Sequence, residues 1–251
     1  MTFDERGIAD FTSTHIEELG ADAAYGVDTR ASATREVLLR LVVLHQDRKA
    51  IDLFARELGS VGISFAPGTT GIYSGRPKAV PLIRLYTFFV EKTAVAAPRV
   101  LLDHQTIVVD IPGGDAVNSP STEPRCPAAT EMPEGPTIKI PLIRLAHARS
   151  GDKGDSSNIA IIARDPIFVP ILRRELTAER MATEFRLLAG GPVHRYEAPG
   201  LHAFNFVIEN ALGGGGMASS RIDPQGKAFG QMALEMMIRA PVALLADIER
   251  A

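Results

Sequence analysis

A segment that cannot build a core of its own divides the chain near its middle. Residues 111–138 are rich in Pro, Gly, Ser and acidic residues, and they carry almost no large apolar side chains. Such a stretch buries too little apolar surface to offset the entropy that it would lose on ordering. We therefore predict a flexible linker between an N-terminal lobe, residues 1–110, and a C-terminal domain, residues 139–251.

The N-terminal lobe shows the pattern of a strand, a helix and a second strand. Residues 35–45 are a run of apolar residues that favours a buried strand, and Asp47 is suited to cap the helix that follows. That helix is predicted to end near Gly59 and Gly62. A second strand is expected at residues 82–90, so the order predicts a small β-α-β lobe. The apolar face of the helix is predicted at Ile51, Phe54, Leu58 and Val61.

The C-terminal half alternates strands and helices. In the strand at residues 202–208, His202, Phe204, Phe206 and Ile208 alternate onto one face, which leaves Asn205 on the other. The order of elements predicts the α+β class, with a ferredoxin-like sandwich in this half. The other predicted strands span residues 142–148, 158–163 and 193–197, and the predicted helices span residues 167–176, 177–188 and 226–238.

A short repeat appears once in each half. Residues 80–85 read VPLIRL and residues 140–145 read IPLIRL. Six residues do not establish a duplication, but the echo is consistent with two related folds.

Most of the candidate chemistry lies in a polar, glycine-rich loop after the strand at residues 142–148. Its two glycines let backbone N–H groups turn toward an anion, and Lys153 and Arg149 add positive charge. Asp152 and Asp155 are suited to orient the lysine or to act as acid or base. The alternative is a tight turn with a surface ion pair. The predicted catalytic residues are Asp152, Lys153 and Asp155, and the predicted binding residues are Arg149, Ser150, Gly151, Gly154 and Asn158.

A second polar cluster begins in the strand at residues 202–208. The amide of Asn205 needs a hydrogen-bond partner. The four glycines at residues 213–216 are of the kind tolerated where a backbone passes close to another group. Neither a phosphate-binding Walker loop nor a dinucleotide fingerprint is present, so no cofactor is predicted. A flexible hairpin loop is the alternative. The predicted binding residues here are Asn205, Gly214, Gly215, Arg221 and Lys227, the last two suited to a phosphate or carboxylate near a helix start.

Charge and composition argue against several classes of protein. The net charge of -3 gives no general attraction to nucleic acid or to an anionic membrane, and neither is expected as a partner. The six histidines show no metal-ligand spacing, and the single cysteine, Cys126, excludes an internal disulfide. The acidic N-terminus is unlike a signal peptide, and no apolar run reaches the ~20 residues that span a bilayer. We expect a cytoplasmic protein.

Several motifs resemble one known family. The strings LAHARSGDKGDSSNIAIIAR, HRYEAPGLHAFNFVIENALGGGG and RIDPQGKAFGQ follow each other as in the C-terminal region of the acyclic terpene utilisation (AtuA-like) family. The resemblance covers residues 139–241 and implies a ferredoxin-like fold there. Residues 10–100 resemble more loosely the end of the family's preceding, larger domain.

The resemblance implies a role in bacterial breakdown of branched, terpenoid and related acids as acyl-CoA thioesters, with hydration or dehydration as one suggested step. The expected partners are a small-molecule carboxylate or acyl-CoA and further subunits in a homo- or hetero-oligomer. Family members usually carry several hundred residues more upstream, whereas this chain starts at Met1. We therefore expect either a hydratase or other lyase component, or a non-catalytic subunit that completes a larger AtuA-type enzyme.

Hydration of a thioester needs an oxyanion site and a positioned acid–base group. The amides of Gly151 and Gly154, or the side chain of Asn205, are expected to form the first. The hypothesis requires the segment at Arg149 and the strand with Asn205 to lie side by side. It predicts that Asp152→Asn or Lys153→Ala abolishes turnover without unfolding the chain.

Overall fold

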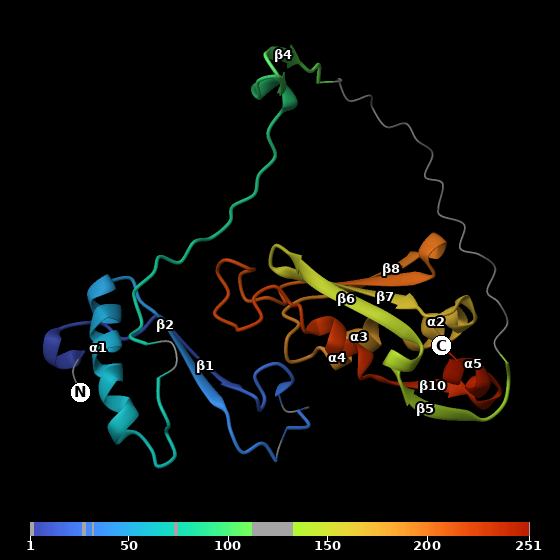
Figure 1. The fold of residues 1–251 in the computed structure, drawn as a ribbon, viewed down its shortest axis with the longest axis horizontal. Helices are drawn as coiled ribbons and strands as arrows, with labels where there is room; N and C mark the ends of the chain where they lie inside the picture. Colours follow the sequence, from blue (N-terminus) through green and yellow to red (C-terminus); the bar gives the residue numbers. More distant parts are fainter. Residues whose placement is uncertain (1–2, 27–28, 32, 73–74, 112–132, 251) are drawn as a thin grey trace. The chain divides into compact units, whose positions relative to one another are not determined.

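The computed structural model describes residues 3–26, 29–31, 33–72, 75–111 and 133–250 (Figure 1). Contacts divide the chain into a larger unit, residues 1–84 with 130–251, and a smaller unit, residues 85–129. The predicted domain boundaries stay a prediction. Residues 112–132, most of the predicted linker together with Cys126, lie outside the described residues.

A two-stranded sheet and one long helix form the N-terminal part of the larger unit. Strand β1 (Ser13–Leu19) pairs antiparallel with β2 (Leu38–Leu44), and α1 (Arg48–Ser64) follows. Asp47 caps α1 as predicted, because its side chain accepts a hydrogen bond from the Lys49 N–H at 2.9 Å. Over residues 1–110 the order is β-β-α-β-β: the predicted strand at residues 35–45 and the helix after it are present, but a strand that was not predicted, β1, precedes them. Strand β2 takes its partner from residues that precede it.

Helix α1 passes through Gly59 and Gly62, where the sequence predicts its end, and stops at Ser64. Neither glycine has a positive φ. The left-handed cap that a glycine favours at the end of a helix is therefore not used here.

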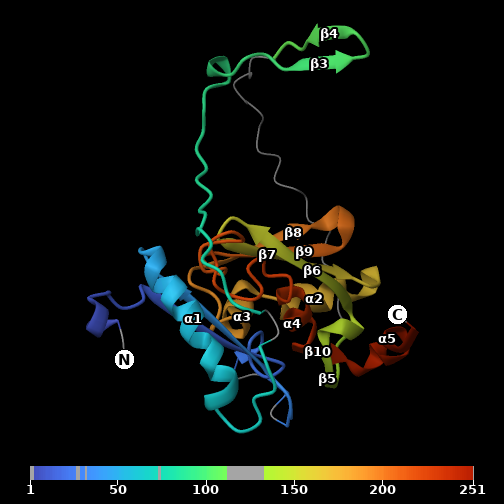
Figure 2. The ribbon, with the colours of Figure 1, turned by 60° about the vertical axis from the view of Figure 1, so that its left-hand side comes forward.

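The predicted strand at residues 82–90 is also wrong for this chain. These residues belong to no strand, and their large apolar side chains are all exposed. The smaller unit instead contains a hairpin of β3 (Arg99–Leu102) and β4 (Gln105–Val108), labelled in Figure 2. An apolar, β-favouring segment forms a strand only where a neighbour accepts its backbone hydrogen bonds.

A four-stranded antiparallel sheet is the centre of the C-terminal region. Helices α3 (Ala178–Glu184) and α4 (Phe229–Leu234) contact this sheet and lie on one side of it (Figure 2). The mixture of sheets and helices confirms the α+β class. From one edge to the other the strands are β6 (Ala146–Lys153), β7 (Ser156–Ala163), β9 (Ala203–Ile208) and β8 (Val193–Ala198).

A smaller antiparallel pair joins the two ends of this region. Strand β5 (Thr137–Pro141) pairs with β10 (Met237–Pro241). Helix α2 (Val169–Glu175) contacts β10, and α5 (Leu245–Arg250) ends the described chain. The start and the end of the domain are therefore held together by backbone hydrogen bonds.

Three segments differ from the predicted elements. Residues 142–144 form a 3-10 turn between β5 and β6 instead of the start of a strand. The predicted loop at residues 149–157 is a tight hairpin, because β6 extends to Lys153 and β7 starts at Ser156. The last long helix is shorter than predicted and ends at Leu234, before β10. Polar residues are tolerated in β6 because one face of an antiparallel sheet can remain exposed.

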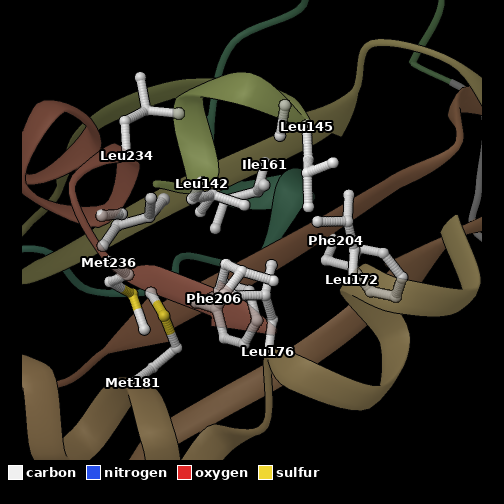
Figure 3. Packing of buried hydrophobic residues seen from close by; sticks show 14 of the residues in the cluster. Leu142, Leu145, Ile161, Leu172, Leu176, Met181, Phe204, Phe206, Leu234 and Met236 are labelled. Carbon is white, nitrogen blue, oxygen red and sulfur yellow. The ribbon is translucent and has the colours of Figure 1, made fainter. Parts of the chain in front are cut away.

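The core lies between the sheet and the helices (Figure 3). Phe204 and Phe206 of β9 are buried beside Leu172 and Leu176, which come from α2 and the residue after it. The predicted alternation in β9 is confirmed for these residues, and Asn205 lies on the other face. Burying a side chain of this size stabilises the fold by about 1.5–3 kcal/mol.

A buried carboxylate fixes α2 and α3 to β10. Glu175 is only 5% exposed; it pairs with Arg180 at 2.7 Å and Arg174 at 3.1 Å, and it accepts the Arg239 N–H at 3.2 Å. Burial raises the pKa of Glu175. The Arg239 N–H, the Arg180 side chain and the two guanidinium charges outweigh burial, so that the pKa lies below its usual value.

We predict that Glu175→Gln lowers the free energy of unfolding by about 2 kcal/mol near neutral pH, since a hydrogen bond to a charged group contributes about 1.5–3 kcal/mol. The native pKa is lowered, so this stabilisation is complete above the unfolded pKa of about 4.3 and is lost as pH falls through the native pKa. Urea unfolding of both proteins over the acid range measures the difference. A difference that did not shrink at low pH would contradict this assignment.

Candidate functional site

The face of the four-stranded sheet away from α3 and α4 collects polar side chains from neighbouring strands. Arg149 of β6 lies opposite Ala160 of β7, which lies opposite Asn205 of β9. Gly151 and Asn158 are paired two residues further along the same strands. Opposed residues, and residues two positions apart, share one face. The two segments are therefore not side by side as predicted, because β7 lies between them, but Arg149 and Asn205 lie on one face of the sheet.

Two amide side chains on this face are joined by a hydrogen bond. Asn158 Nδ2 donates to Asn205 Oδ1 at 3.2 Å, which provides the partner that the amide of Asn205 needs. Both residues are half-buried. The bond fixes the orientation of the two amides and leaves the Nδ2 hydrogens of Asn205 to donate elsewhere.

Lys227 reaches the same face from the loop before α4. A Cβ on Gly151 would lie 3.1 Å from Lys227 Nζ and 3.9 Å from Asn158 Oδ1. The ammonium and the amide oxygen therefore both lie close over the glycine. A side chain at position 151 would therefore contact the ammonium, and the flexible lysine would have to shift slightly to make room.

The positive charges on this face are not neutralised. Among the described residues, neither Arg149 nor Lys227 forms an ion pair with a carboxylate. An ammonium, a guanidinium and the amide of Asn205 thus present hydrogen-bond donors to one surface. Such a set suits a carboxylate, a phosphate or a polarised carbonyl oxygen.

Ser150 has a structural contact instead of a place on this surface. Its side chain is buried, donates to the Lys227 carbonyl at 3.1 Å and accepts the Gly230 N–H at 2.8 Å. These bonds fix the start of α4 to β6. Ser150 therefore positions the backbone of Lys227, and its hydroxyl does not face the ligand surface.

The β6–β7 turn is attached to the glycine-rich loop. Asp155 accepts the Gly214 N–H at 2.7 Å, and a Cβ on Gly215 would lie 2.7 Å from the Gly154 carbonyl oxygen. Arg221 donates to a backbone carbonyl in the same loop. Gly215 is therefore required by the close packing of two backbones. Gly151 is paired within the β6–β7 ladder, so the predicted nest of outward amides does not form at Gly151.

Asp152 and Lys153 lie on opposite faces of β6. Asp152 is opposite Ser157, which is buried on the helix side of the sheet. Lys153 is exposed on the side of Asn158 and donates to the Asp152 carbonyl at 2.9 Å. Of the three predicted catalytic residues, Lys153 alone shares the face of the amide pair.

A histidine that is not among the predicted site residues also lies on this face. His194 of β8 is opposite Val207 and pairs with Glu209 at 2.8 Å. His194 is a diagonal neighbour of Asn205, which lies on the adjacent strand β9, and long side chains can bridge the distance between such neighbours. The alternation along β8 could have identified this histidine. Arg195 is opposite the buried Phe206 on the helix side, so His194 and Tyr196 lie on the other face.

Two cavities lie elsewhere on the larger unit. One of about 370 Å³ is lined by Tyr25, Arg30 and Glu235, among others. Burial, and then the nearby charge of Glu235, raise the pKa of Tyr25. The other, of about 630 Å³, lies along β8. Neither of these two is lined by Arg149 or by the amide pair, whereas His194 lines the second. Arg149 and Lys153 are exposed.

Among the residues that the structure describes, no three His, Cys, Asp or Glu side chains are placed to hold a metal ion. No helix within them is long and apolar enough to cross a membrane.

Comparison with protein families identifies both regions. A model of the AtuA ferredoxin-like domain matches residues 140–239, and a model of the acyclic terpene utilisation family protein AtuA matches residues 1–101. The chain belongs to the acyclic terpene utilisation family. No curated protein and no solved structure matches it.

A buried carboxylate contributes to the contact between the two regions of this AtuA-like chain. Glu17 of β1 accepts the Ile222 N–H at 2.8 Å and pairs with Arg40, its cross-strand neighbour. Arg40 also donates to the Ser220 carbonyl at 2.6 Å. The N-terminal hairpin therefore fixes the loop that leads to Lys227.

Burial raises the pKa of Glu17, but the Ile222 N–H, the Arg40 side chain and His15 outweigh it and hold the pKa below its usual value. The ionised carboxylate is thus the form that fixes the loop. Its contribution to stability is present above the unfolded pKa and is lost as pH falls through the lowered native pKa.

We predict that Glu17→Gln frees the loop at residues 220–222. The variant loses charge-assisted hydrogen bonds worth about 1.5–3 kcal/mol, so the Ile222 amide should exchange with solvent about 10- to 100-fold faster. Hydrogen exchange measured by NMR tests this. Glu18→Gln, at an exposed neighbouring position, is the matched control and should leave the Ile222 amide unchanged. Equal exchange in both variants would contradict the proposed anchor.

Proposed function

We propose that this AtuA-like chain takes part in the breakdown of branched or terpenoid carboxylic acids and their acyl-CoA thioesters, as a hydratase or other lyase component. Its exposed sheet face would bind the carbonyl or carboxylate oxygen of the substrate. Family membership supports the substrate class. The observation that carries the site is the convergence of Lys227, Asn158 and Asn205 on one face. The proposal places the protein in the cytoplasm.

These groups suit the charge that develops in thioester chemistry. Adding water across the double bond of an α,β-unsaturated acyl thioester, or eliminating it from a β-hydroxyacyl thioester, places negative charge on the carbonyl oxygen. Asn205 Nδ2 and the Lys227 ammonium are donors for such an oxygen. The Asn158–Asn205 hydrogen bond restricts the reorientation of the Asn205 amide. Arg149 supplies a further positive charge for a carboxylate or phosphate of the same molecule.

The acid–base group is proposed from the same face. Lys153 is the predicted catalytic residue that lies there, and His194, oriented by Glu209, is of the type that most often transfers protons. Asp152 and Asp155 remain predictions from the sequence. The first faces the helix side of the sheet, and the second is engaged with Gly214.

A non-catalytic subunit is the second candidate, and the exposure of Arg149 and Lys153 favours it. Neither residue lines the two cavities described above. A larger AtuA-type chain that covered this face would bury the cations in an interface instead of against a small ligand. In that case the isolated protein would bind no acyl-CoA.

We predict that Lys227→Met weakens binding of a branched acyl-CoA, such as isovaleryl-CoA, by about 10- to 100-fold, the equivalent of one charge-assisted hydrogen bond. Isothermal titration calorimetry of the full chain measures this. Lys139→Met removes an exposed lysine from β5, away from the cluster, and should leave the affinity unchanged.

Two outcomes would count against the catalytic reading. Equal loss of affinity in both variants would show general attraction between charges instead of a site. No binding by the native protein would leave the assembly subunit as the better candidate.

A further inference from the structure

An exposed tyrosine lies beside the amide pair. Tyr196 of β8 is directly opposite Asn205 of β9, so the two side chains share the polar face of the sheet. Tyr196 is 56% exposed. Among the residues that the structure describes, its hydroxyl has no hydrogen-bond partner and its ring contacts no other aromatic ring. An aromatic ring carries a large apolar surface, and this one remains available to a ligand.

The positions around Asn205 divide the face into two parts. On the side of β6 lie the cations of Arg149 and Lys227. The positions next to Asn205 in the register of β7, β8 and β9 are mostly apolar or aromatic. They are Ala160 and Ile162 of β7, Ala203 and Val207 of β9, and Tyr196 and Ala198 of β8. Asn205 therefore lies at the boundary between a cationic part and an apolar part.

An acyl-CoA thioester has a matching division. Its carbonyl oxygen accepts hydrogen bonds, its CoA moiety carries negatively charged phosphates, and its acyl chain is apolar. With the carbonyl oxygen at Asn205, the phosphates are attracted toward β6, where Arg149 and Lys153 are exposed. The acyl chain then gains most by covering the apolar positions toward β8, because this removes apolar surface from water.

Tyr196 is within reach of a short acyl chain that starts at Asn205. Directly opposed residues of antiparallel strands have Cβ atoms about 4.5–5.5 Å apart. A branched chain of a few carbons thus reaches the tyrosine ring, whereas an acetyl group does not extend that far. Space for the end of the chain is present at this edge of the sheet, because Tyr196 and His194 also line the cavity of about 630 Å³ along β8.

We propose that Tyr196 is a specificity-determining residue, whose ring packs against the branched acyl chain while Asn205 binds the carbonyl oxygen. The inference rests on the proposed function, because it takes the position of the carbonyl oxygen from it. It adds the residue that distinguishes a branched chain from a short one. The contact is apolar, so it needs the ring of Tyr196 but not its hydroxyl.

The test compares two thioesters that differ only in the acyl chain, isovaleryl-CoA and acetyl-CoA. In isothermal titration calorimetry of the full chain, the native protein should bind isovaleryl-CoA about 10-fold more tightly, since each fully buried carbon contributes about fourfold and this face is partly open. Tyr196→Ala should remove most of this preference and leave the affinity for acetyl-CoA unchanged. Tyr196→Phe is the matched control: it keeps the ring and should keep the preference.

NMR of the native protein gives a second readout that needs no variant. Nuclear Overhauser contacts are expected between the isovaleryl methyl groups and the ring protons of Tyr196. Suppose that Lys227→Met weakens binding of isovaleryl-CoA, but that these contacts are absent and Tyr196→Ala has no effect. That result would overturn this inference and leave the proposed function in place, and so would equal weakening of both thioesters by Tyr196→Ala. No binding of either thioester by the native protein would overturn both.

Discussion

The antiparallel register of β6, β7 and β9 is the constraint on which the candidate site depends. It aligns Gly151 with Asn158, and Arg149 with Asn205 across Ala160. A slip of one residue would move the amides to the helix side and Ile159 to the exposed face. The buried Phe204 and Phe206 oppose such a slip, because each would have to leave the core. Burial of the apolar side chains therefore fixes the strand register, and the register fixes which residues lie on the polar face.

The predictable parts of the fold are those with a strong local signal. Asp47 caps its helix as its side chain suggests, and the alternation in β9 identifies which residues are buried. Strand β1 was missed for a non-local reason. Whether an apolar run pairs depends on a neighbour, and β2 finds its neighbour in β1, whose sequence STHIEEL has too few apolar residues to mark it as a strand.

The candidate site was predictable in composition but not in arrangement. The polar residues around Arg149 were visible in the sequence, yet a hairpin distributes them over two faces, so that Asp152 and Lys153 separate. Contacts far apart in sequence decide the rest. Lys227 lies over Gly151, Asp155 holds Gly214, and Glu17 fixes the loop before Lys227. The N-terminal region of this AtuA-like chain is thereby part of the machinery that positions the site.

The central claim, that donors on the exposed sheet face receive an oxygen of an acyl thioester, is tested most directly by the side-chain amides themselves. Titration of the full chain with isovaleryl-CoA, followed by NMR, should shift the Nδ2 resonances of Asn158 and Asn205 together, with Asn210 as an internal reference. Saturable shifts of the first two alone are the predicted result. Binding that leaves both unchanged, or shifts confined to other residues, would contradict the claim.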